Sequence, residues 1–113
     1  MSVDYITFQD AELTLPKASG DIDHDIDFIT EDADPAESAV LSFLVNPNGG
    51  TPTLALSLNG TTVTTMTFGT DVRRVMQENF SQSLLTGEDT LRVRLTGGGS
   101  VSVSDFALMY KRV

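Results

Sequence analysis

Alternating aspartates are the feature of this sequence that most suggests chemistry. Eight of the sixteen acidic residues lie between positions 21 and 37. A hard cation such as Ca²⁺ requires several carboxylate oxygens close together. In an extended strand, however, side chains on one face stand about 7 Å apart, too far to wrap one ion together. This pattern therefore predicts a charged strand face better than a calcium-binding loop.

Two further interpretations of that face stay open. It is either a solvated face, in which charge on an edge strand prevents pairing with another chain, or a face whose carboxylates pair across strands with arginines. The arginines in question project from one face of the predicted strand 91–96. The same side chains are those we predict to form an interface with a protein partner: Asp21, Asp23, Asp25, Asp27, Arg92 and Arg94.

Catalytic chemistry has little support in this chain. His24 is the single imidazole, it alternates with Ile22 and Ile26 on an apolar face, and the chain contains no Gly-x-Ser-x-Gly motif. The absence of cysteine excludes a disulfide framework, a thiol nucleophile and a thiolate metal site. We therefore predict a protein that is not an enzyme and that requires no cofactor.

Period-two hydrophobic patterns separated by turn residues run through the chain, whereas long helical patterns are absent. The pair Asn59-Gly60 predicts a hairpin, and a change of apolar parity near Asp105 predicts a bulge. Asp71, followed by apolar residues at 72, 75 and 76, predicts one short helix. The fold class is all-β, an antiparallel β-sandwich or jelly roll of about eight strands, in one domain over residues 1–113. The predicted strands cover 5–8, 12–15, 21–29, 39–45, 54–58, 61–68, 91–96 and 100–110.

Charge excludes some partners and suggests others. The 113 residues carry a net charge of −9, which argues against nucleic acid, and no apolar run approaches the roughly 20 residues of a membrane-spanning helix. Residues 1–56 hold eleven acids and one base, whereas residues 57–113 hold five acids and six bases. The two halves therefore carry −10 and +1, an asymmetry that favours head-to-tail contacts between copies. An acidic surface of this kind also suits life at high salt.

Residues 39–110 resemble the galactose-binding-like jelly-roll superfamily, which includes many carbohydrate-binding modules. The resemblance rests on Leu56-Ser-Leu-Asn-Gly60, Leu85-Thr-Gly-Glu-Asp-Thr-Leu-Arg-Val93 and Val101-Ser-Val-Ser-Asp-Phe-Ala-Leu108. It implies a structural calcium between an early acidic strand and the closing strand, and a ligand loop after the first central strand. The matching residues are Asp10, Glu12 and Asp105 for the metal, and Asn48, Gly49 and Gly50 for the loop.

Two functions follow from these observations. The first is a structural or assembly module that decorates or cements a larger particle, fibre or surface layer, such as a virion, through contacts with protein partners. The alternative is a carbohydrate-binding module with a structural calcium. Tryptophan is absent and the two tyrosines lie near the termini, so few aromatic rings are present to stack on a sugar. No signal peptide is visible after Met1, and both a particle surface and the cytoplasm remain open as locations.

Overall fold

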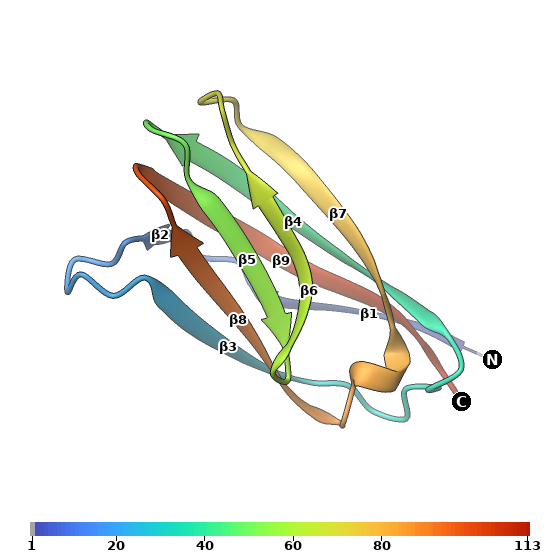
Figure 1. Ribbon diagram of the computed structural model, residues 1–113. Helices are drawn as coiled ribbons and strands as arrows, with labels where there is room; N and C mark the ends of the chain where they lie inside the picture. The colour runs from blue at the N-terminus through green and yellow to red at the C-terminus, as the bar shows by residue number, and fades with distance from the viewer. Residues whose placement is uncertain (1) are drawn as a thin grey trace.

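A computed structural model describes residues 2–113 as two antiparallel sheets packed face to face (Figure 1). One sheet has the strand order β1-β9-β4-β7, with β2 also paired to β9, and the other has the order β3-β8-β5-β6. This arrangement confirms the predicted all-β sandwich. The strands are β1 (Ser2–Gln9), β2 (Leu13–Leu15), β3 (Asp23–Ile29), β4 (Ser38–Asn48), β5 (Thr53–Leu58), β6 (Thr61–Thr67), β7 (Arg74–Ser81), β8 (Glu88–Thr96) and β9 (Ser100–Arg112).

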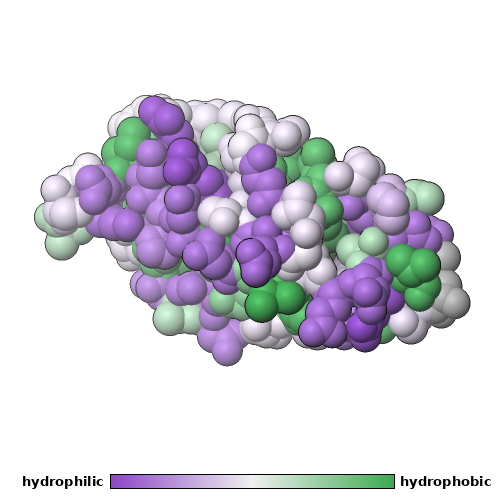
Figure 2. Space-filling model, turned by 90° about the horizontal axis from the view of Figure 1, so that it is seen from below, coloured by the Kyte–Doolittle hydropathy of each residue, from purple (hydrophilic) through white to green (hydrophobic). Residues whose placement is uncertain are grey.

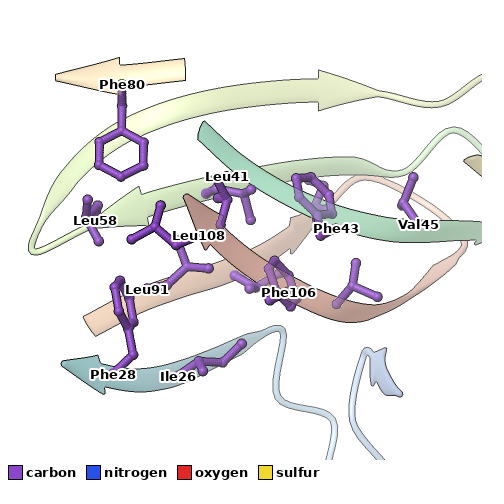
Figure 3. Packing of buried hydrophobic residues seen from close by; sticks show 14 of the residues in the cluster. Ile26, Phe28, Leu41, Phe43, Val45, Leu58, Phe80, Leu91, Phe106 and Leu108 are labelled. Carbon is purple, nitrogen blue, oxygen red and sulfur yellow. The ribbon is translucent and has the colours of Figure 1, made fainter. Parts of the chain in front are cut away.

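The core lies between the sheets and follows from the alternation of apolar residues along the central strands (Figure 3). In β4 every second residue from Ala39 to Val45 is buried. The rings of Phe43 and Phe106 stack across β4 and β9 with their centroids 5.1 Å apart. Such interdigitated apolar packing supplies most of the favourable free energy of folding.

The predicted bulge is confirmed in β9. Asp105 has φ +53°, in the left-handed region that aspartate tolerates better than most residues. Opposite it, the pairing of β4 with β9 shifts register between Ser42 and Leu44. Before the bulge the odd-numbered residues Val101 and Val103 face the core. Because the bulge adds one residue, the even-numbered Phe106 and Leu108 face the core after it.

The predicted helix after Asp71 is wrong. The structure instead places the edge strand β7 there, hydrogen-bonded to β4 from Ser38 to Val45. Phe80 is buried and Met76 half-buried on the inner face of this strand, whereas Val72 and Val75 are 55% and 65% exposed. A period of two therefore buries larger side chains than a helical period would. The one helical segment of residues 2–113 is a short 3₁₀ turn, η1 (Gln82–Leu84).

Helices of membrane-spanning length do not occur in the described part of the chain: no helix there is long and apolar enough to cross a bilayer.

Candidate functional site: a groove at the edge of the sandwich

An open groove of about 830 Å³ lies where β1 and β3, edge strands of opposite sheets, run beside each other. We call it the edge groove. Viewed from below the molecule, apolar surface lies between two hydrophilic areas (Figure 2). The groove is lined by Ile6, Thr7 and Phe8 of β1, by Asp27, Phe28 and Ile29 of β3, and by Glu88, Asp89 and Thr90 of β8.

The apolar wall of the edge groove extends outward from the core. Phe8 stacks on Phe28, with ring centroids 4.4 Å apart and an interplanar angle of 22°. Phe8 also approaches Phe106 of the core at 5.8 Å, while Ile29 at the rim is 63% exposed. The groove thus offers apolar surface of the kind that accepts the C–H face of a sugar ring.

The polar wall is held in place by hydrogen bonds around Asp89, which is 2% exposed. Its Oδ2 accepts from the Thr30 hydroxyl at 2.7 Å. Its Oδ1 accepts from Asn59 Nδ2 and from the Thr86 backbone N–H, each at 2.8 Å. Because these donors come from three separate segments, the carboxylate joins them into one rigid wall.

Asn59 connects the β5–β6 turn to this wall. The predicted Asn-Gly hairpin is confirmed, with Asn59 at φ +50° and Gly60 at φ +89°. Beyond the turn, Asn59 Oδ1 accepts from the Thr90 N–H at 2.9 Å, and its Nδ2 also donates to the Leu84 carbonyl at 2.8 Å. The sequence pattern predicts the turn but not this second role of the side chain.

The charges in the groove are all of one sign. Asp27, Glu88 and Asp89 line it, and no lysine, arginine or histidine among residues 2–113 does. The Thr90 hydroxyl donates to Asp27 Oδ1 at 2.7 Å. Carboxylates accept hydrogen bonds from hydroxyl groups and repel anions, so this lining suits a neutral, hydroxyl-rich ligand.

The aspartates of β3 pair across strands, one of the arrangements that the sequence left open. Arg92 binds both carboxylate oxygens of Asp25, at 2.8 and 3.1 Å, and Arg94 lies 3.7 Å from Asp23. The hydrogen bond from Arg92 lowers the pKa of Asp25 from its usual 3.8. Because the folded pKa is the lower one, the pair stabilises the fold above about pH 4 and loses this effect as pH falls. Both side chains are about half exposed, so solvent screens the contribution.

A second depression of about 490 Å³ lies beside these arginines on the outer face of β5, β6 and β8. Its floor consists of small residues such as Ala55, Ser57 and Thr62. It has no aromatic or large aliphatic side chain to cover an apolar ligand face, and for this reason the edge groove is the better candidate.

The acidic and basic halves of the chain meet within one molecule. Besides Arg92 and Arg94, Lys111 lies 3.4 Å from Glu37. Arg112 lies 3.2 to 3.8 Å from three acids of the first half, Asp4, Glu31 and Asp32. Four of the six bases in the second half are therefore already paired inside the chain, which removes the charge argument for head-to-tail contacts.

Backbone pairing brings together the segments of the predicted calcium site. β1 and β2 both pair with β9, with Gln9 opposite Phe106 and Leu13 opposite Val103. Residues 10–12 therefore lie opposite 104–105. Within residues 2–113, however, no three acidic or histidine side chains form a group able to hold a metal ion. The carboxylates of Asp10, Glu12 and Asp105 do not converge, so an ion at this place needs backbone carbonyl oxygens as well.

The remaining predicted positions lie away from the edge groove's lining. Asn48 ends β4, and the Gly49 N–H donates to Asp71 Oδ1 at 2.9 Å. A Cβ on Gly50 would lie 2.7 Å from the backbone of Gly98, so this loop packs tightly against the β8–β9 turn. His24 is half-buried opposite Val93 on β8.

Comparisons with known proteins identify the fold. No family model and no curated protein matches the chain, but many solved structures do. Dimeric latent PorU from Porphyromonas gingivalis superposes with a TM-score of 0.65 and 17% identity. That match covers 96% of this chain and 12% of PorU, so the chain corresponds to a small part of that protein.

Carbohydrate-binding modules match over nearly their whole length. The module CBM36, in complex with calcium and xylotriose, has a TM-score of 0.53 and 15% identity over 95% of this chain and 98% of its own. The C-terminal CBM6 of LamC, a marine laminarinase from Zobellia galactanivorans, has a TM-score of 0.53 and 10% identity over 97% and 100%. Two family 35 modules match as well, one over 97% and the other over 73% of its own length. The chain thus shares the two-sheet β-sandwich fold of these modules.

Proposed function

We propose that this chain is a non-catalytic glycan-binding module whose ligand site is the edge groove. The observation that carries the proposal is the groove itself, which combines an apolar wall with the exposed carboxylate of Asp27, held in place by a hydrogen bond from Thr90. Pre-ordered polar groups bind hydroxyls without a further entropic cost of ordering. The likeness to carbohydrate-binding modules supports this function over the assembly role, and four of the six bases of the second half already pair with acids of the same chain.

The ligand class follows from the charge of the lining. Carboxylates without a neighbouring base favour neutral oligosaccharides and disfavour uronic acids or sulfated sugars. Xylotriose, neutral β-glucan fragments and neoagarooctaose are suitable first probes, each compared with an anionic oligosaccharide of the same length. We expect binding to the neutral set alone.

Isothermal titration calorimetry on the wild type, Ile29→Ser and Val75→Ser tests the location of the site. Ile29 and Val75 are β-branched strand residues of nearly equal exposure, 63% and 65%, but only Ile29 lines the groove. Losing one apolar contact of roughly 1.4 kcal/mol weakens binding about tenfold. We expect this loss for Ile29→Ser and none for Val75→Ser.

Three results would contradict the proposal: no binding to any neutral glycan, equal weakening by both substitutions, or loss of binding in Asn48→Ala with the groove variants intact. The last result would place the ligand at the loop that the sequence predicted.

Calcium belongs to the same proposal. The register of β1 and β2 on β9 supports an ion between residues 10–12 and Asp105 that stabilises the fold and does not itself contact the groove. Carbonyl and carboxylate oxygens are the ligands that calcium prefers.

A further inference from the structure

The outer face of the β1-β9-β4-β7 sheet carries few charges for a chain of net charge −9: Lys111, which stands opposite Val3, and the exposed Asp105 at the β9 bulge. The charged residues Asp4, Arg74 and Glu78 of these strands stand opposite buried core residues and so belong to the inner side. We call the outer surface the neutral face. It comprises Val3, Tyr5 and Thr7 of β1, Ala107 and Met109 of β9, Val40, Ser42 and Leu44 of β4, and Val75, Gln77 and Asn79 of β7.

Large apolar side chains are exposed on the neutral face. Tyr5, Val3 and Met109 are 61%, 60% and 47% exposed. The register places Tyr5 beside Met109, and Met109 beside Val40, so they form one continuous row across three strands. Lys111 borders the row, and its ammonium already lies 3.4 Å from Glu37.

The neutral face carries both a projecting side chain and a depression that can receive one. A hollow of about 180 Å³ lies among Val3, Val40, Asn79, Met109 and Lys111, next to the exposed ring of Tyr5, which stands opposite Met109. Its size suits a single side chain. A surface with a projection and a matching hollow is self-complementary, the property that a two-fold contact between identical chains requires.

From these observations we propose that the chain forms a two-fold dimer through the neutral face, with Tyr5 of each copy seated in the hollow of the other. Copies of a strongly acidic chain repel each other wherever their acids meet, and the acid nearest the hollow, Glu37, is already paired with Lys111. A dimer interface buries roughly 800 Å² per partner. A sheet face on a molecule of 43 × 25 × 22 Å offers an area of that size.

Analytical ultracentrifugation of the wild-type chain over a concentration series tests the dimer. In a two-fold contact, Met109→Glu places a new carboxylate on both partners inside the interface, so we expect the dissociation constant to rise by more than about tenfold. Val72→Glu is the matched control, because Val72 has similar exposure, 55%, and lies in the turn before β7. It adds the same charge outside the neutral face and should leave the dimer intact.

Salt gives an independent readout. Raising NaCl screens repulsion between the acidic copies, so a dimer held by the neutral face tightens. A head-to-tail dimer held by opposite charges would weaken instead. Circular dichroism confirms that each variant is folded.

The dimer is ruled out if the wild type stays monomeric at high micromolar concentration, if Val72→Glu dissociates it as fully as Met109→Glu, or if salt weakens it. The dimer proposal would also be overturned if the wild type is monomeric and Met109→Glu loses glycan binding. That result would assign the neutral face to a ligand. The oligomeric state is measured without glycan, so failure here leaves the edge-groove proposal untouched.

Discussion

At the scale of single residues, buried hydrogen bonds do the most to shape the candidate site. Asp89 is a nearly fully buried carboxylate that finds all of its partners in neighbouring segments. A buried charge is tolerated only when it is paired or well hydrogen-bonded. Donors from three residues, Thr30, Asn59 and Thr86, meet that condition and fix the polar wall of the edge groove at the same time.

Two substitutions of Asp89 test how much its hydrogen bonds stabilise the fold. In Asp89→Ala the hydroxyl of Thr30 and the amide of Asn59 lose their acceptor, and we expect a loss of about 3 kcal/mol in the free energy of unfolding. Asp89→Asn keeps the shape and one acceptor oxygen, so its loss should be clearly smaller. Urea denaturation measures both. Equal losses in the two variants would show that the carboxylate's hydrogen bonds are not what stabilises this wall.

At the scale of elements, β9 organises the first sheet. It pairs with β1, β2 and β4, and its bulge at Asp105 stands opposite the interruption between β1 and β2. The interruption and the bulge meet at one place, which sets residues 10–12 beside a residue in a left-handed conformation. This juxtaposition is the structural basis for the calcium proposal.

Melting curves test the ion at that place. With calcium in hundredfold excess over its dissociation constant, the fold gains about 2.7 kcal/mol, which raises the melting midpoint of a domain this size by about 10 °C. Asp105→Gly keeps the left-handed backbone, so it should melt near the wild type in chelator and gain little from calcium. An unchanged wild-type midpoint on adding calcium would remove the site.

At the scale of the whole molecule, the chain contains several ion pairs but also a large excess of acidic residues. Bases of the second half bind acids of the first half, yet the net charge is still −9. Exposed ion pairs are each worth at most about 1 kcal/mol, whereas uncompensated like charges act over the whole surface. The destabilisation of the fold by repulsion among its acidic side chains should therefore exceed the stabilisation from the ion pairs.

Stability should consequently rise with salt. Because the Debye length falls from about 10 Å to about 3 Å between 0.1 and 1 M salt, we expect a higher melting midpoint in concentrated NaCl. Arg92→Gln combined with Arg94→Gln increases the negative charge and should steepen this dependence. A midpoint that falls as NaCl is added would mean that the ion pairs dominate.

Several features of the fold could be predicted because their causes are local. The turn at Asn59-Gly60 requires residues that accept positive φ, and the bulge at Asp105 appears directly as a change of parity. The helix predicted after Asp71 was wrong, because Val72, Val75 and Met76 have the spacing of one helical face although the segment forms a strand. The hydrogen bonds available along the open edge of β4 decided for the strand.

The amino-acid sequence by itself determined an all-β chain with its turns, its alternating core residues and its acidic first half, since each depends on neighbours a few residues apart. Only the tertiary structure decided which strands lie at the edges and what meets there. Phe8, Phe28 and Asp89 come from three strands of two sheets, and no local pattern relates them. The edge groove and the neutral face arise from how the sheets pair and pack, because that packing brings distant residues onto common surfaces.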